Sequence, residues 1–293
     1  MARHAIDAEL SLVIPTLGRD LLRGTLESVM AGTVWPAKVI IVDQGQTPWI
    51  GALSHDLSAR GMPVDYVPST TTGRSAGLNT GIERVATRYF AVTDDDCPVA
   101  PDWIARMGAR LRRHEHAIVT GRAVAAEGEV QLSVVTSEVE SVQRRPSLRF
   151  DRMSGANVGM SLEIARRVGP FNEDPSMRTA EDTEFAYRAL RRGVPIVYAP
   201  ELVVTHLGWR DETGRAGQYG GYGRSHGGFL GWYVRRGDLF IAVRALVHLA
   251  RAARRWLVGG LRGDAEMARN GRAYVVNLGP GFITGWKAGG RST

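Results

Sequence analysis

The chain has 293 residues, of which 44% are hydrophobic, and a formal net charge of +7. This length and composition allow a sizeable buried core and exclude a disordered or fibrous protein. The single cysteine, Cys97, excludes an intramolecular disulfide framework, and no apolar leader opens the chain, so we expect a cytoplasmic protein. No run of about 18 uncharged apolar residues is present, so we expect no membrane-spanning helix.

Short β-rich runs alternate with helical patterns through the first 120 residues. The β-rich runs are Leu10 to Pro15, Val39 to Asp43, Val64 to Val67, Tyr89 to Thr93 and Ala117 to Thr120. The helical patterns cover residues 21–31, 49–60, 76–86 and 103–113. This alternation predicts a largely parallel sheet with helices on both faces, and ligands of such sheets bind at the carboxyl ends of the strands.

Two polar positions lie at or after strands in the first part of this pattern. Asp43 ends the second strand, where its carboxylate can accept a hydrogen bond from a nucleoside or cap the turn that follows. The segment Gly73 to Asn79 is a loop that enters a helix, and Arg74 can meet a phosphate there beside the N–H groups of the helix start.

Three consecutive aspartates, Asp94, Asp95 and Asp96, follow the apolar run 89–92. Adjacent carboxylates at the carboxyl end of a strand are hard oxygen ligands, and they predict a cation site shared with phosphate. An acidic turn that only solvates the strand end is the alternative. His206 closes a later β-like run and could project from the same edge, although a histidine in such a place is more often structural.

A helix is predicted to begin near Ala180, with Glu181 and Asp182 in its first turn. Thr179 precedes Asp182 by three residues, which is typical of a capping box. The positive end of the same helix keeps the Asp182 carboxylate ionised and ready to accept a proton from a hydroxyl, with Glu181 as an exposed neighbour. Both roles stay open.

The segment Gly208 to Gly231 is very rich in glycine, with aromatic residues between the glycines. This composition predicts a mobile loop, in which glycines can act as hinges of a lid over a bound ligand. Trp209 or Tyr222 would then offer a flat face to that ligand.

The last predicted helix runs from about Asp238 to Leu261, in a strongly basic tail. From Arg235 onward 11 Arg and Lys residues stand against 3 Asp and Glu residues, a net charge of +8, which leaves −1 for everything earlier. One stripe of this helix is cationic, and apolar residues lie opposite. The cationic stripe consists of Arg244, His248, Arg251, Arg255 and Arg262. Such a helix can lie on a membrane with its cationic face toward anionic headgroups, or it can pack on the sheet as an ordinary surface helix.

These positions together resemble the family 2 glycosyltransferases, inverting enzymes of the GT-A fold, over about residues 9–210. The resemblance is carried by Val13-Ile14-Pro15-Thr16, Val42-Asp43, Asn79-Thr80-Gly81-Ile82, the aspartate cluster with Pro98 and Pro101-Asp102-Trp103, Gly155-Ala156-Asn157, and Glu181-Asp182. In two places the chain departs from the family pattern. Leu78 stands where many relatives have an arginine, so Arg74 is expected to take over phosphate contact, and the Q-x-x-R-W signature of processive relatives is absent.

The resemblance implies a role for each of these residues. Pro15, Thr16 and Asp43 would contact the nucleotide, and Asp94 and Asp96 would form the D-x-D pair at the ribose and the metal. We also expect Arg74, Asn79 and Asp95 to contact the donor. Asp96 and His206 would hold Mg²⁺ or Mn²⁺, and Asp182 would be the catalytic base. Glu181 and Trp209 are expected at the acceptor.

We therefore expect a GT-A, Rossmann-like domain over residues 1–232 and a basic amphipathic helical extension over residues 233–293. The expected enzyme moves a single sugar, with inversion, from a nucleoside diphosphate sugar (UDP or dTDP foremost) to a glycan or lipid-linked acceptor, at the inner face of the membrane. Nucleic acid is not an expected partner. The alternatives are a sugar nucleotidyltransferase, which usually shows a glycine-rich phosphate loop at its first strand, and a non-catalytic glycan-binding protein.

Overall fold

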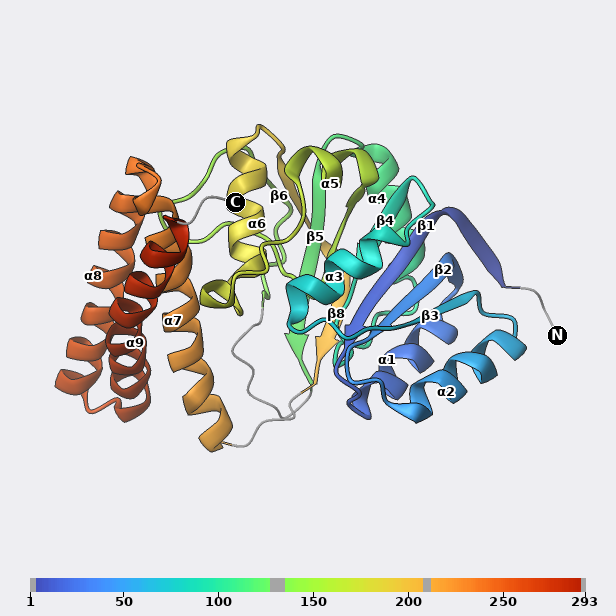
Figure 1. Cartoon of the computed structure of the whole chain (residues 1–293), viewed down its shortest axis with the longest axis horizontal. Coiled ribbons are helices and arrows are strands. Elements are labelled where there is room, and N and C mark those ends of the chain that lie inside the picture. The colour runs from blue at the N-terminus through green and yellow to red at the C-terminus, as the bar shows by residue number, and fades with distance from the viewer. Residues whose placement is uncertain (1–3, 127–134, 208–211, 291–293) are drawn as a thin grey trace. The chain divides into compact units, whose positions relative to one another are not determined.

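The computed structural model of the chain describes residues 4–126, 135–207 and 212–290 (Figure 1). The chain forms two compact units. The first unit holds a β-sheet with its surrounding helices. The second unit consists of three long helices at the carboxyl-terminal end, together with residues 146–151 and 172–185.

The sheet of the first unit has eight strands in the order β3-β2-β1-β4-β7-β5-β8-β6. In chain order they are β1 (Ala5–Thr16), β2 (Val34–Asp43), β3 (Val64–Pro68), β4 (Tyr89–Val92), β5 (Ile118–Ala125), β6 (Ser141–Gln143), β7 (Val158–Ser161) and β8 (Ile196–His206). The first four strands pair in parallel, as do β5 and β8, whereas β7 and β6 run antiparallel to their neighbours. The prediction of a mostly parallel sheet is confirmed.

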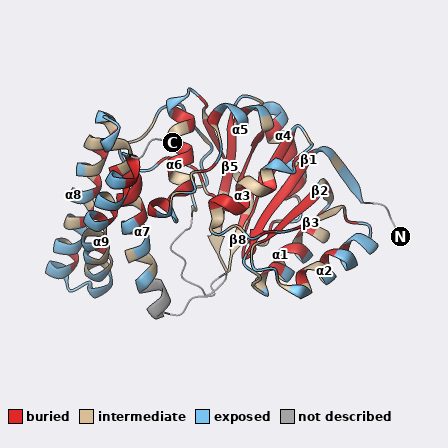
Figure 2. Cartoon of the chain, viewed as in Figure 1, coloured by how far each residue is buried: buried red, intermediate tan, exposed pale blue. Residues whose placement is uncertain are grey.

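Helices in the described residues surround the sheet or join its strands. They are α1 (Leu21–Met30), α2 (Pro48–Ala59), α3 (Arg74–Glu83), α4 (Trp103–Arg113), α5 (Leu162–Val168), the short 3-10 turn η1 (Pro175–Met177) and α6 (Glu181–Arg191). Leu10, Leu12 and Ile14 of β1 are fully buried, as expected of a central strand covered on both faces. Figure 2 shows the buried strands with helices whose outer sides are exposed.

The strand order reverses at β1. The chain passes from β1 to β2 and β3 on one side, and then returns to place β4 on the other side of β1. Open α/β sheets bind ligands at such a switch point, outside the carboxyl ends of the strands. The fold therefore directs attention to the residues that follow β1 and β4.

Residues Glu212–Arg235 form helix α7, so the prediction of a mobile loop over Gly208 to Gly231 is wrong for the part of that segment that the structure describes. The glycines of α7 contact helix α9 (Ala265–Gly289). A Cβ atom on Gly227 would lie 2.2 Å from the Leu278 carbonyl oxygen, and one on Gly231 would lie 2.1 Å from that of Phe282.

Helix α9 mirrors this arrangement. A Cβ atom on Gly281 would lie 2.0 Å from the Arg224 carbonyl oxygen, and one on Gly285 would lie 1.9 Å from that of Gly228. Glycines four residues apart thus let the two backbones approach closely, the pattern by which small residues pack helices in membranes. This tertiary packing overrides the low helix propensity of glycine.

Helix α8 (Leu239–Arg262) agrees closely with the helix predicted from about Asp238 to Leu261. The Asp238 side chain caps its start by accepting from Ile241 N, and Gly263 ends it in a left-handed conformation with φ 70°. Helix α9 was not predicted. The expected domain boundary at residues 232 and 233 falls inside α7. None of the helices in the described ranges is long and apolar enough to cross a membrane.

Candidate active site at the carboxyl edge of the sheet

Side chains that end β1 and β4 meet at the switch point. Val13 of β1 pairs with Val92 of β4, so Thr16 and Asp95 lie three residues beyond this pair on neighbouring strands. The Thr16 hydroxyl donates to Asp95 Oδ2 over 2.6 Å, and Gly18 N donates to Thr16 Oγ1. The parallel pairing of β1 with β4 therefore places Thr16 beside the aspartate cluster. Such a contact is expected where the carboxyl ends of neighbouring parallel strands lie together.

Arg19, from the loop after β1, binds two of the three aspartates. Its guanidinium donates to both carboxylate oxygens of Asp95, and its Nη1 lies 2.8 Å from Asp96 Oδ2. Burial raises the pKa of the Asp95 carboxyl, while Arg19 and the Thr16 hydroxyl oppose that rise. Arg19 is not among the residues predicted from the sequence, because an arginine in a loop carries no local signal of its partner.

Arg74 binds the remaining aspartate. Its Nε and Nη2 atoms lie 2.9 and 2.8 Å from Asp94 Oδ1. A Cβ atom at Gly155 would lie only 3.1 Å from Arg74 Nη1, so this glycine leaves room for the guanidinium. Every aspartate of the cluster is thus partnered by an arginine, and the Arg74 phosphate contact stays a prediction.

The ends of β4 and β8 form a small set of possible metal ligands. Asp96, Cys97 and His206 each offer one ligand atom, and these atoms lie within 4.8 Å of one another. Leu207 N donates to the Asp96 carbonyl oxygen over 2.9 Å, and Thr205 N donates to that of Pro98 over 2.8 Å. These backbone bonds fix His206 beside the aspartate turn.

The chemistry of this set fits a divalent cation. Nδ1 of His206 is buried and has no hydrogen-bond partner among the residues that the structure describes. Carboxylate oxygen and imidazole nitrogen are ordinary ligands of Mn²⁺ and related ions. Burial raises the pKa of the Cys97 thiol, and the Asp94 and Asp96 carboxylates add to the rise.

Asp43 and Asn79 make local contacts. Asp43 is fully buried; its Oδ1 accepts from Gly45 N and its Oδ2 from Thr47 N and the Tyr66 hydroxyl. These bonds match the turn-capping alternative for Asp43. The Asn79 amide group bonds both the N–H and the carbonyl of Phe171, each over 2.9 Å, and so ties α3 to residue 171. The nucleotide contacts expected of both residues stay predictions.

Asp182 and Glu181 lie in the second unit, at the start of α6. Asp182 is half-buried, and its Oδ1 accepts from Thr183 N over 2.6 Å. Glu181 is 5% exposed, so its description as an exposed neighbour is wrong. Thr179 N donates to Ser225 Oγ, and the Thr179 hydroxyl donates to the Gly221 carbonyl at 3.5 Å, contacts with α7 that a capping box does not predict. Trp209 lies outside the described residues.

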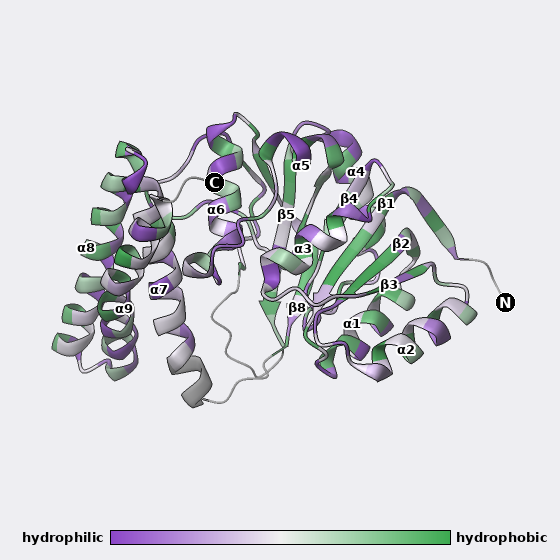
Figure 3. Ribbon diagram, in the orientation of Figure 1, coloured by the Kyte–Doolittle hydropathy of each residue, from purple (hydrophilic) through white to green (hydrophobic). Residues whose placement is uncertain are grey.

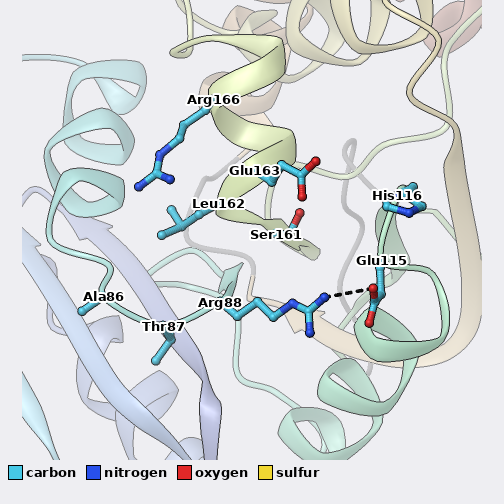
Figure 4. A pocket seen from close by; sticks show the side chains of 9 residues that line it. All are labelled: Ala86, Thr87, Arg88, Glu115, His116, Ser161, Leu162, Glu163 and Arg166. Atoms are coloured by element: carbon cyan, nitrogen blue, oxygen red, sulfur yellow. Dashed lines mark hydrogen bonds and ion pairs between the residues drawn. The ribbon is translucent and has the colours of Figure 1, made fainter.

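A cavity of about 380 Å³ lies away from the aspartate cluster, at the amino end of β4 (Figure 4). Arg88, Arg166, Glu115 and Glu163 are among its lining residues, and Arg88 forms an ion pair with Glu115 at 2.9 Å. The mixed charges give this cavity no net positive character for a diphosphate. The aspartate cluster and His206 lie instead at the carboxyl ends of the strands.

The family model described as "Glycosyl transferase family 2" matches residues 11–167. Chondroitin synthase from Escherichia coli is 25% identical over 250 residues, which cover 71% of this chain and 36% of that protein. The chain spans 17% to 41% of the length of the curated relatives that it matches.

Solved structures share the fold. The mannosyltransferase PcManGT from Pyrobaculum calidifontis, in complex with GDP-Man and Mn²⁺, superposes with a TM-score of 0.64 at 15% identity, over 96% of this chain and 86% of that one. S. aureus TarS (residues 1–349) in complex with UDP-GlcNAc gives a TM-score of 0.56 at 14% identity, over 81% and 66%. At these identities the likeness concerns the fold alone.

Proposed function

The chain belongs to glycosyl transferase family 2 and has the GT-A fold, and on that premise we propose that it transfers a single sugar, with inversion, from a nucleoside diphosphate sugar to a hydroxyl of an acceptor. The observation that carries the proposal is the buried pair Asp95 and Asp96 beside the half-buried His206 at the carboxyl ends of the strands. A row of carboxylates beside an imidazole without a hydrogen-bond partner among the described residues is suited to a cation and, through it, a diphosphate.

Asp96 and His206 are the proposed metal ligands. A divalent cation held there would neutralise the charge that develops on the departing diphosphate. Because Mg²⁺ prefers an all-oxygen shell, the His206 imidazole favours Mn²⁺ over Mg²⁺. The mannosyltransferase of similar fold has Mn²⁺ and GDP-Man in its structure, so GDP joins UDP and dTDP among the bases to be tested.

Arg19 and Arg74 are proposed to contact the diphosphate. Both guanidiniums lie on the aspartate cluster, Arg19 with 32% and Arg74 with 21% of its side chain exposed. A guanidinium that binds a carboxylate can bind a phosphate with the same paired geometry. Thr16, Pro15 and Asp43 then belong to the nucleoside side of the site, at the ends of β1 and β2.

Asp182 is the proposed catalytic base, and Glu181 an acceptor contact. A carboxylate in the first turn of a helix is favoured in its ionised form by the helix dipole, as a general base requires. We expect Asp182→Asn to lower turnover at least about 10²-fold while donor affinity stays nearly unchanged. Equal damage from Glu181→Gln, with Asp182→Asn active, would transfer the role to Glu181.

The acceptor is proposed to be a glycan or a lipid-linked hydroxyl in envelope or polysaccharide synthesis, reached through peripheral contact with an anionic membrane. The basic tail supports this membrane contact, because its charge of +8 is complementary to anionic headgroups. The cytoplasmic location expected from the single cysteine stays a prediction.

A panel of UDP, dTDP and GDP sugars, scored by thermal shift with and without Mn²⁺, tests the donor and the metal together. One base and sugar should raise the melting temperature more when Mn²⁺ is present, and Asp96→Asn should abolish this gain. The control is Asp102→Asn, a partly exposed aspartate that precedes α4. A gain that is equally large in Asp96→Asn would remove Asp96 from the metal site.

A further inference from the structure

The outer side of α8 is apolar and exposed. Large side chains recur on it within about 40° of one direction, at 100° per residue. This apolar face of α8 consists of Leu239, Val243, Leu246, Leu257 and Leu261, each between 49% and 88% exposed. Figure 3 shows hydrophobic residues along α8, and Figure 2 shows exposed stretches along the same helix.

The cationic stripe of α8 faces the interior of the second unit over its first half, so the prediction that it meets headgroups is wrong there. Arg244 is fully buried and forms an ion pair with Asp151 at 2.7 Å. His248 is 6% exposed, and its Nε2 donates to the Arg149 carbonyl over 2.6 Å. The partners come from residues 146–151, which are almost a hundred positions earlier in the chain and which a helical pattern does not reveal.

The length of the apolar face indicates that it is an interaction surface. Helix α8 has 24 residues and is therefore about 36 Å long. Contiguous apolar patches on a protein surface mark sites of protein or membrane interaction. The five side chains of the apolar face lie on one helix, so a flat or gently curved surface can cover them all at once.

Charge identifies the partner. Arg254 is exposed and lies about 50° from the centre of the apolar face, and the chain from Arg235 onward carries a net charge of +8. A second copy would bring the same positive charge against this face, and like charges oppose such a pairing. A bilayer with anionic headgroups is complementary to the charge and apolar beneath it.

Exposed tryptophan supports the same partner. Trp256 is 40% exposed and lies about 110° from the centre of the apolar face, on the side away from Arg254, and Trp286 of α9 is exposed to the same degree. Tryptophan side chains are enriched where a membrane meets water, because the ring is apolar and its N–H is polar. Leucine, tryptophan and arginine on one amphipathic helix are typical of a helix that lies in the interface.

We propose that α8 lies parallel to an anionic bilayer and inserts its apolar face among the acyl chains, while the inward part of its arginine stripe stays bound to residues 149 and 151. This inference deepens the membrane contact named in the proposed function and does not depend on sugar transfer. Its readout is therefore binding to lipid. Failure of donor binding and failure of membrane binding are separate results.

The test is sedimentation of the full chain with vesicles of phosphatidylcholine alone or mixed with phosphatidylglycerol. The unaltered protein should sediment with the mixed vesicles, and Leu246→Glu/Leu257→Glu should lose at least about tenfold in partitioning because two charges would enter the apolar layer. The matched control is Ile6→Glu/Val139→Glu, which places the same charges on exposed apolar positions of the first unit. This control should still bind.

A probe on the face reports insertion directly. Cys97 is buried, so Leu257→Cys can be labelled selectively with an environment-sensitive fluorophore. Its emission should shift to the blue with phosphatidylglycerol vesicles and stay unshifted in their absence. No sedimentation of the unaltered protein, or equal sedimentation of the two glutamate variants, would overturn the proposal. A dimer in light scattering that Leu246→Glu/Leu257→Glu makes monomeric, with no lipid binding, would instead assign the face to a second copy.

Discussion

A single residue, Arg19, is expected to affect both metal binding and diphosphate binding. Its guanidinium lies on Asp95 and on the expected metal ligand Asp96, and the two carboxylates raise its pKa although burial alone would lower it. The same positive charge opposes a cation and attracts a diphosphate. Metal and donor binding should therefore respond to Arg19 in opposite directions.

We expect Arg19→Gln to bind Mn²⁺ about tenfold more tightly in the absence of nucleotide, because about 1.4 kcal/mol of charge repulsion is removed at the partly exposed site. In saturating Mn²⁺ the same variant should bind the nucleoside diphosphate about tenfold more weakly, since paired hydrogen bonds to phosphate are lost. Titration calorimetry measures both affinities. Arg23→Gln, an exposed change on α1, is the control, and a shift of both affinities in one direction would refute the assignment.

Which site residues the sequence could predict depends on where their partners come from. Thr16 and His206 end strands and Asp95 follows one, so the sequence pattern predicts that all three lie at the carboxyl ends of the strands. Arg19 sits in a loop, and its target could be learned only from coordinates. At Asp43 the position in the sequence does not decide the role. A carboxylate at the end of a strand can contact a ligand or accept hydrogen bonds from the N–H groups of the next turn, and Asp43 does the latter.

At the level of elements, the close contact between α7 and α9 makes a sharp prediction about glycine. Gly227→Ala places a methyl group 2.2 Å from a backbone oxygen of α9, and we expect a loss of about 1–3 kcal/mol in the free energy of unfolding through overpacking. Gly221→Ala, on the same helix with open space at its Cβ, should instead stabilise by about 0.5–1 kcal/mol. Urea denaturation followed by circular dichroism measures both, and equal effects would contradict the close approach.

Two histidines join helices α7, α8 and α9. His248 Nε2–H donates to the Arg149 carbonyl, so its Nδ1 accepts from the Tyr274 hydroxyl, whose oxygen in turn accepts from His226 Nδ1–H. Burial lowers the pKa of His248 to about 4 and that of His226 to about 3, with Arg244 adding to both shifts. His226 is half-buried whereas His248 is only 6% exposed, so we expect His248 to account for the larger share of any pH effect.

The helices of the second unit should therefore lose stability in acid. The unfolded chain takes up protons near pH 6.5 and the folded chain only near pH 4 or below, so stability present above pH 6.5 falls as the pH is lowered through that range. Between pH 7 and pH 5 the loss should be about 2 kcal/mol for His248. Urea midpoints at several pH values measure it. His248→Gln should flatten the dependence, whereas His55→Gln, an exposed change on α2, should not.

Secondary structure was predictable where local pattern and packing agree. The strands and helices of the first 120 residues follow hydrophobic periodicity, and the structure places them close to the predicted ranges. Helix α7 was missed because glycine favours loops until a second helix packs against it, and that second helix, α9, begins only at Ala265, 30 residues after α7 ends at Arg235. Antiparallel β7, inserted between β4 and β5, likewise depends on distant partners.

At the level of the whole molecule, the second unit gathers segments that are far apart in the chain. Composition places a boundary near residue 232, where basic residues begin to dominate, but compactness places residues 146–151 and 172–185 with the tail. The Arg244–Asp151 pair, which neither composition nor periodicity can indicate, is the most buried link between these segments, with both side chains fully covered.

Breaking this pair should destabilise the fold far more than breaking a surface pair. Arg244→Met leaves the Asp151 charge buried, and we expect a loss of about 3–5 kcal/mol in the free energy of unfolding. Arg88→Met, which removes an exposed partner of Glu115, should cost less than about 1 kcal/mol. Urea denaturation compares the two. Adding Asp151→Asn to Arg244→Met should recover much of the loss, and no recovery would show that the packing of Arg244 matters more than its charge.

The exposed apolar face of α8 has a kinetic consequence. A protein held on a bilayer searches for its acceptor in two dimensions, so the rate of encounter with a lipid-linked hydroxyl would follow the surface density of that lipid and not its bulk concentration. Diluting the acceptor with inert lipid at constant total amount should then slow transfer, while diluting the whole suspension with buffer should leave the rate for each bound enzyme almost unchanged.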